Sequence, residues 1–118
     1  MVVDDDSDIL VLLRTIFEQN GYEVLTVDNG KDCLHELERG FKGIVLIDLM
    51  MPFMDGFSTI KKIIQNGYED NVVISVISAN PYPDISEVQD IQQYIKAYIA
   101  KPFNVRELVN TVIHRNNS

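Results

Sequence analysis

The sequence has little that would place it in a membrane or in an oxidising compartment. Its one cysteine, Cys33, cannot form a disulfide within the chain, which fits a reducing cytosol. Its longest apolar runs, such as Ile9–Leu13, are far shorter than the roughly 20 residues that a membrane-spanning helix needs. The start of the chain lacks the basic residue and apolar run of a secretory signal. We therefore expect a cytoplasmic protein that does not bind membranes.

Basic residues are also scarce. The 118 residues include 10 Lys and Arg against 18 Asp and Glu, so the formal net charge is −8 at pH 7. Binding to nucleic-acid phosphates requires clustered lysines and arginines, and we expect no nucleic-acid binding by this chain. The length suits one domain, and a chain of this size buries enough surface for a core without disulfides. No repeat or linker interrupts it, so residues 1–118 are predicted to form a single domain.

Two apolar patterns alternate along the chain. Apolar residues at helical spacing predict four helices, around Ile9–Phe17, Cys33–Leu37, Phe57–Ile64 and Val105–Ile113. Short apolar runs predict five strands, Val2–Val3, Tyr22–Val27, Ile44–Ile47, Val72–Ile77 and Tyr98–Ala100. Ser7 and Asn104 are expected to cap the first and last helices. A further, polar helix is predicted after Asp84 and Glu87, which have capping-box spacing, and through residues 89–93.

This alternation predicts an α/β fold. The run Ile44–Ile47 has no polar residue between its apolar ones, which is typical of a strand buried on both faces, as in parallel sheets. Strands that alternate with helices form such a sheet, because each crossover packs its helix back onto the sheet. We expect a (βα)5 sandwich, a five-stranded parallel sheet with helices on both faces.

Chemically active side chains follow four of the predicted strands. Acids stand at positions 4–6 after the first strand and at Asp48 after the third, Ser78 follows the fourth, and Lys101 follows the fifth. The carboxyl ends of parallel strands meet at one edge of the sheet. Two carboxylates about 4 Å apart repel each other by roughly 4 kcal/mol at an effective dielectric near 20. Lys101 alone supplies a single positive charge against these acids, so the sequence predicts a divalent ion with oxygen ligands, Mg²⁺ or Mn²⁺.

A carboxylate beside such an ion can attack a phosphoryl group. The product is an acyl phosphate, and the ion withdraws charge from the phosphoryl oxygens during the attack. Lys101 and the hydroxyl of Ser78 are suitable donors to the remaining oxygens. Backbone carbonyls of the loop after Asp48 could complete the metal coordination.

Three strings at the strand ends, VVDDD, IDLMMPFMDG and AYIAKPF, resemble the receiver domain of two-component response regulators. The resemblance extends over essentially the whole chain. It implies a flavodoxin-like strand order of 2-1-3-4-5. It also implies a signalling phosphoacceptor and not an enzyme, with at most self-phosphorylation from small donors and slow autodephosphorylation.

The resemblance also implies a role for each residue of the predicted site. Asp48 would be the phosphoacceptor and a metal ligand, and Asp5 would be the direct metal ligand. Asp4 would bind the metal through water, and the carbonyl of Met50 would be a further ligand. The remaining three residues would be Lys101, which pairs with the phosphoryl group, Ser78, the switch hydroxyl, and Tyr98, the switch aromatic.

The implied partners are a histidine kinase or a histidine phosphotransfer protein as donor, and an unidentified output partner or domain. The output would act through the surface of the fourth helix, fifth strand and fifth helix, with a possible phosphorylation-dependent dimer. Three alternatives stay open. One is a magnesium-dependent phosphatase of the haloacid-dehalogenase type, which wants a second acid where Met50 stands. The others are a flavin-binding electron carrier and a phosphorylation-independent interaction module.

Overall fold

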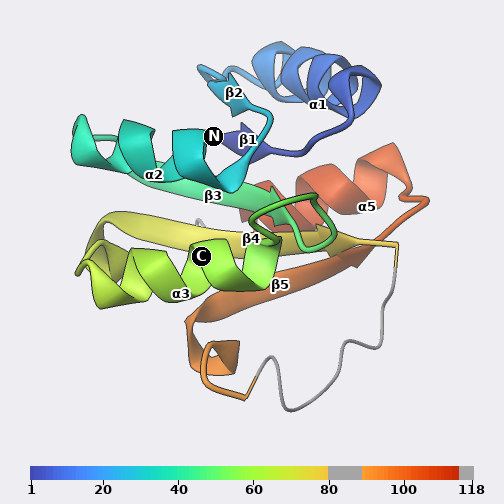
Figure 1. Cartoon of the computed structure of the whole chain (residues 1–118). Coiled ribbons are helices and arrows are strands. Elements are labelled where there is room, and N and C mark those ends of the chain that lie inside the picture. The colour runs from blue at the N-terminus through green and yellow to red at the C-terminus, as the bar shows by residue number, and fades with distance from the viewer. Residues whose placement is uncertain (80–88, 115–118) are drawn as a thin grey trace.

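The computed structural model describes residues 1–79 and 89–114, which form one five-stranded sheet with helices on both faces (Figure 1). All neighbouring strands are parallel, in the order β2-β1-β3-β4-β5. The strands are β1 (Val2–Val3), β2 (Thr26–Val27), β3 (Gly43–Asp48), β4 (Val72–Ser78) and β5 (Ile95–Ala100). The predicted fold class and strand order are therefore confirmed.

The helices form two layers. Their bounds are α1 (Ser7–Gln19), α2 (Gly30–Glu38), α3 (Gly56–Gln65) and α5 (Val105–Val109), with short 3-10 helices at Glu69–Asn71 (η1) and Gln92–Tyr94 (η2). Buried residues of α1 and α5 share one core cluster with the sheet, and those of α2 and α3 share the other. None of the helices in the described ranges has both the length and the apolar composition that a bilayer crossing requires.

The central strand β3 explains why the sheet needs both layers. Val45 and Ile47 are completely buried in the core beneath α2 and α3, while Leu46 is buried in the core beneath α1 and α5. Successive side chains of a strand point to opposite faces, so an uninterrupted apolar run must be covered on both sides. This matches the prediction from Ile44–Ile47, and it leaves the strand's polar end, Asp48, at the edge of the sheet.

Several predicted boundaries were wrong. The strand predicted over Tyr22–Val27 is reduced to the two residues of β2, because β1, its partner in the described part of the sheet, offers two residues for pairing. Helix α1 is capped by Asp6, whose side chain accepts the N–H of Asp8 at 2.9 Å, and not by Ser7, which is the first helical residue.

The C-terminal part differs in three ways. Strand β5 begins at Ile95, earlier than predicted. The last helix is capped by Asn104 as expected, but after Val109 it continues as a π-helix over Asn110–His114. The predicted fourth helix starts at Asp84 and Glu87, which lie outside the described residues. Where the prediction reaches described residues, the chain forms a turn and then η2 instead of an α-helix.

Candidate functional site

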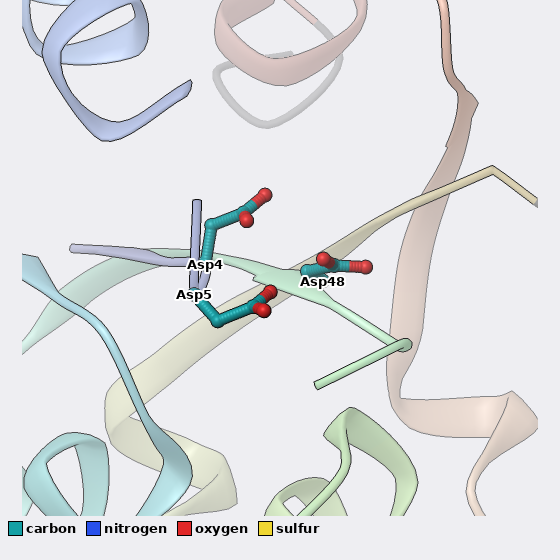
Figure 2. A group of neighbouring side chains, drawn as sticks. All are labelled: Asp4, Asp5 and Asp48. Atoms are coloured by element: carbon teal, nitrogen blue, oxygen red, sulfur yellow. The ribbon is translucent and has the colours of Figure 1, made fainter. Parts of the chain in front are cut away.

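Three acids meet at the carboxyl edge of the sheet. Strands β1 and β3 are parallel neighbours with Val3 opposite Ile47, so Asp4, the next residue after β1, comes beside Asp48, the last residue of β3. Figure 2 shows Asp4, Asp5 and Asp48 gathered at the ends of these two strands. One carboxylate oxygen from each of the three lies within 4.8 Å of the others. The sequence predicted this cluster from the strand ends alone.

The three acids differ in their exposure to solvent. Asp4 is fully buried and Asp48 is 3% exposed, whereas Asp5 is exposed. Two buried acids and one exposed acid leave the cluster open on the side of Asp5. Carboxylate oxygens with access to water form the donor set that Mg²⁺ and Mn²⁺ prefer. The chemistry of these residues thus fits a small divalent cation.

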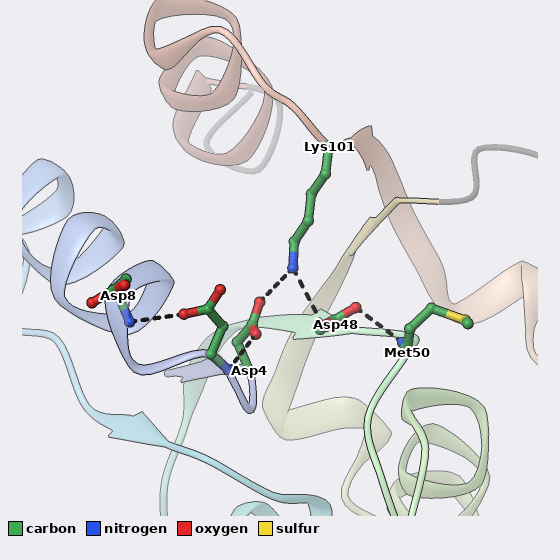
Figure 3. Close-up of polar contacts among 6 residues, drawn as sticks. Asp4, Asp8, Asp48, Met50 and Lys101 are labelled. Carbon is green, nitrogen blue, oxygen red and sulfur yellow. Dashed lines mark hydrogen bonds and ion pairs between the residues drawn. The ribbon is translucent and has the colours of Figure 1, made fainter.

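Lys101 connects the two buried acids. Its Nζ donates to Oδ2 of Asp4 at 2.8 Å and to Oδ2 of Asp48 at 3.3 Å (Figure 3). The lysine is held at this edge because its backbone N–H donates to the carbonyl of Ser78 at 2.8 Å, directly after β5. One ammonium group therefore reaches across the edge from β5 to the ends of β1 and β3.

The second oxygen of each buried acid is bound by its own loop. Oδ1 of Asp4 accepts the backbone N–H of Asp6 at 2.9 Å, and Oδ1 of Asp48 accepts the N–H of Met50 at 2.9 Å. Side chains of aspartate commonly form this turn with the N–H two residues on. The two turns fix both carboxylates with one oxygen toward the loop and the other toward Lys101.

The charges of the site do not balance. Three carboxylates face one ammonium group, which leaves an excess of two negative charges among these residues. Burial raises the pKa of Asp48, and the nearby negative charge of Asp4 raises it further. The hydrogen bond from the N–H of Met50 and the positive charge of Lys101 lower it, but the pKa stays above its usual value. Burial by itself would lower the pKa of Lys101, but its bonds and proximity to Asp4 and Asp48 outweigh burial and raise the pKa. The site is therefore electrostatically prepared for an additional positive charge.

The other predicted residues lie around this centre. Ser78 is buried at the end of β4, next to β3, where Ile77 is opposite Asp48. Met50 belongs to the loop after Asp48, and its side chain is 62% exposed. Tyr98 lies on β5 two residues before its end, and its side chain is exposed. Partial burial of the phenol group raises its pKa. The structure thus places Met50 and Ser78 beside the acids, and Tyr98 farther back along β5.

Sequence reasoning missed two residues between the end of β3 and the start of α3, Phe53 in the loop and Gly56 at the start of the helix. The sequence did not single out Gly56, yet a Cβ at this position would collide with the carbonyl oxygen of Asp48 and with Cα of Leu49. The side chain of Phe53 is fully exposed on a left-handed backbone with φ of 66°. No signal in the sequence marks the Gly56 contact. Phe53 could have been noticed, because it is a large aromatic residue in a loop sequence that starts with Pro52 and ends in Asp55.

Comparison with known proteins gives a consistent answer. The family described as the response regulator receiver domain matches residues 1–113. The chain is 36% identical over 109 residues to the transcriptional regulatory protein CpxR homolog of Haemophilus influenzae, and 31% identical over 112 residues to the transcriptional regulatory protein PrrA of Mycobacterium tuberculosis. These matches cover 92% and 95% of this chain but 46% and 47% of the relatives. The chain therefore spans about half the length of the curated relatives it matches.

Solved structures show the same similarity. A CheY-like response regulator receiver domain protein from Methanospirillum hungatei matches with a TM-score of 0.88 and 35% identity, over 100% of this chain and 96% of that one. The response regulator TrrA from Thermotoga maritima, solved with Mg²⁺ and BeF, matches with a TM-score of 0.79 and 28% identity, over 97% and 95%. Together with the acid cluster and its lysine, these matches lead to one conclusion: the chain belongs to the response regulator receiver domain family.

Proposed function

We propose that this receiver domain acts as a phosphoacceptor switch in which Asp48 accepts a phosphoryl group from a phosphohistidine. The donor is a histidine kinase or a histidine phosphotransfer protein in the cytoplasm. The observation that supports this most is the state of Asp48 itself. Its carboxylate stands at the end of β3 between an ammonium group 3.3 Å away and two further acids. This carboxylate has a fixed orientation and lies in a site whose negative charges exceed its positive charge.

The transfer is a simple exchange of bonds to phosphorus. A carboxylate oxygen of Asp48 attacks the phosphorus atom, and the P–N bond of the phosphohistidine breaks. The electron pair of that bond returns to the imidazole nitrogen, which takes up a proton from water, so that a neutral histidine remains on the donor and an acyl phosphate on Asp48. Lys101, already bonded to Oδ2 of Asp48, is positioned to pair with an oxygen of the new phosphoryl group.

Asp5, Asp48 and the carbonyl of Met50 are the residues that would hold Mg²⁺ or Mn²⁺ directly, with Asp4 acting through a bound water. The exposed position of Asp5 and the 4.8 Å limit within the cluster support this assignment. When bound, the ion offsets the negative charge of the carboxylates and withdraws charge from the phosphoryl oxygens. The hydrogen bond from the backbone N–H of Met50 to the side chain of Asp48 holds the loop after β3 against the proposed phosphoacceptor.

The switch would act through Ser78 and Tyr98. The phosphoryl group would draw the hydroxyl of Ser78 inward, and Tyr98 would rotate from its exposed position into the space released. Such a change would shift the populations of two conformations of the surface that includes β5 and α5. The phosphoryl group shifts these populations only because it interacts more favourably with one conformation than with the other. This surface would bind the output partner or domain, or a second phosphorylated copy. The proposed surface also includes the predicted fourth helix, whose start lies outside the described residues.

The alternatives are less well supported. A phosphatase of the haloacid-dehalogenase type needs an acid two residues after its nucleophile, and this chain has Met50 there. A flavin carrier needs phosphate-binding backbone N–H groups, where this chain presents Asp4 and Asp5 instead. An interaction module that works without phosphorylation would have no use for the bond between Lys101 and Asp48.

Exposure to acetyl phosphate and Mg²⁺, followed by intact-mass measurement, tests the proposal. We expect the wild type to gain the mass of one phosphoryl group, and Asp48→Asn to gain none. The matched control is Asp70→Asn, which removes an exposed acid from η1 near the start of β4 and should be phosphorylated like the wild type. An adduct that persists undiminished in Asp48→Asn would overturn the assignment of the acceptor.

A further inference from the structure

Phe53 combines two features that are unfavourable for a phenylalanine. Its side chain is fully exposed, and its backbone φ is 66°. The left-handed region is readily adopted by glycine and tolerated by asparagine, but it crowds the Cβ of other residues. Among the described residues, Phe53 is the one residue other than glycine with a positive φ. Local strain of this kind persists where the surrounding structure holds it and is often associated with function.

The loop that carries Phe53 is held at both ends. Gly56 packs directly on the backbone of Asp48, and its N–H donates to the carbonyl of Leu49 at 3.1 Å. Asp55 caps α3 by accepting the N–H of Ser58 at 2.8 Å. Met51, within the loop, is 8% exposed and belongs to the core. A loop anchored in this way keeps the ring of Phe53 in solvent instead of letting it fold onto the core.

Phe53 forms one wall of a groove beside the acid cluster. The groove has a volume of about 570 Å³ and lies between the loop after β3 and the segment formed by the turn after β2 and the first turn of α2. Its lining includes Asp5, which also belongs to the acid cluster, as well as Pro52 and Met54. The opposite wall is formed by Asp28, Asn29, Lys31 and Asp32. The groove is thus continuous with the proposed phosphoryl site.

The acids of the opposite wall are held together. The side-chain amide of Asn29 donates to Asp28 at 2.6 Å and to Asp32 at 2.9 Å. Within residues 1–79 and 89–114, no basic side chain pairs with either carboxylate. The lining therefore contains three carboxylates against the single ammonium group of Lys31. An occupant with a positive charge beside apolar surface would complement both walls.

We propose that this groove binds an arginine side chain of the protein that donates the phosphoryl group, and that Phe53 is its anchor. This inference rests on the proposed function, because a phosphohistidine can reach Asp48 only if its protein covers the adjoining rim. The guanidinium group would lie between the carboxylates of Asp28 and Asp32 and the face of the Phe53 ring, where charge pairing and cation–π attraction act together. Exposed aromatic residues are common anchors of protein interfaces.

The first experiment compares a small donor with a protein donor. The variant Phe53→Asn removes the ring and keeps a residue that tolerates the left-handed backbone. We expect its phosphorylation by acetyl phosphate to stay within twofold of the wild type. Transfer from autophosphorylated histidine kinases of the source organism, screened one by one, should slow at least tenfold through a higher KM. Phe53→Tyr, which retains the ring, should restore the wild-type rate.

The second experiment measures binding directly. An acetylated, amidated peptide of arginine and leucine is titrated into the wild-type chain, and the NMR shifts of Phe53 and residues 28–32 are followed. We expect saturable shifts at both walls, and none with the peptide in which glutamate replaces arginine. In the double variant Asp28→Asn/Asp32→Asn, affinity for the arginine peptide should fall at least fivefold and depend less on ionic strength. Asp70→Asn should bind it like the wild type.

The outcomes separate the two proposals. If acetyl phosphate leaves no adduct on the wild type and no kinase transfers to it, the proposed function fails, while the peptide titration still decides whether the groove binds arginine. If kinases transfer to Phe53→Asn as fast as to the wild type, Phe53 is not an anchor and the inference is overturned. Absence of shifts at Phe53 and residues 28–32 on addition of the arginine peptide would equally overturn it.

Discussion

Asp48 has to remain reactive in a place that disfavours its charge. It is nearly buried, lies beside Asp4 and Asp5, and receives compensation from Lys101 and the N–H of Met50. The raised pKa of its carboxyl group shows that burial and the charge of Asp4 outweigh this compensation. In the absence of a divalent ion, the ionised side chain therefore lowers the stability of the fold.

This balance predicts that Asp48→Asn stabilises the fold at neutral pH when divalent ions are absent. We expect the free energy of unfolding to rise by about 1–2 kcal/mol, because a buried charge that is incompletely paired is replaced by a neutral amide. Since the folded-state pKa of Asp48 is raised, the folded protein takes up this proton more readily than the unfolded chain, and the contribution of Asp48 to the free energy of unfolding falls as pH rises through that pKa. The advantage of the variant should therefore disappear as pH falls toward about 4.

Urea denaturation with EDTA, repeated across this pH range for both proteins, measures the difference. Asp70→Asn serves as the control, because Asp70 is exposed and its substitution should leave the pH dependence unchanged. A variant less stable than the wild type at pH 7 would mean that the bond between Asp48 and Lys101 outweighs the cost of burial.

Loops and short elements position the site more than long helices do. β1 has two residues and β2 has two, yet the register of β1 with β3 brings Asp4 beside Asp48. The loop from Leu49 to Asp55 depends on the close approach of Gly56 to the end of β3. The sequence predicted that each of these elements exists, because apolar periodicity is local. It did not predict their ends or this contact, because both depend on a partner elsewhere in the fold.

At the scale of this loop we predict that Gly56→Ala is damaging. A Cβ would overlap the backbone of Asp48 and Leu49, and the required movement should cost about 1–3 kcal/mol of stability. It should also slow phosphorylation by acetyl phosphate, because Asp48 itself is displaced. Ser58→Ala, an exposed change in the same helix, is the matched control and should alter stability by less than about 0.5 kcal/mol. If Gly56→Ala is as stable as the wild type and is phosphorylated at the same rate, the loop can shift without affecting the site, and the prediction is wrong.

At the scale of the whole molecule, the sheet brings together charged residues that are far apart in the sequence. Residues 97 positions apart, Asp4 and Lys101, come within 2.8 Å of each other, and the acids exceed the single lysine by two charges. Any cation that binds the assembled edge binds the folded state, since the unfolded chain does not bring these ligands together. Its binding energy is then added to the stability of the whole domain.

We therefore predict that Mg²⁺ raises the melting temperature of the domain. A concentration 100 times the dissociation constant adds about 2.7 kcal/mol to the free energy of unfolding. Calorimetry with and without millimolar Mg²⁺ measures the shift, which should be lost in Asp5→Asn and retained in Asp70→Asn. If the melting temperature of the wild type does not respond to Mg²⁺ and Asp5→Asn is neutral, these acids do not form a metal site.

The sequence by itself determined the fold class, the strand order through its resemblance to a family, and the identity of the residues at the strand ends. These depend on local periodicity and on the rule that parallel strands present their carboxyl ends at one edge. Only the tertiary structure decided the orientation of each carboxylate toward Lys101, the contact between Gly56 and Asp48, and the groove beside Phe53. Such features depend on distances between segments remote in the chain, which a pattern of neighbouring residues does not encode.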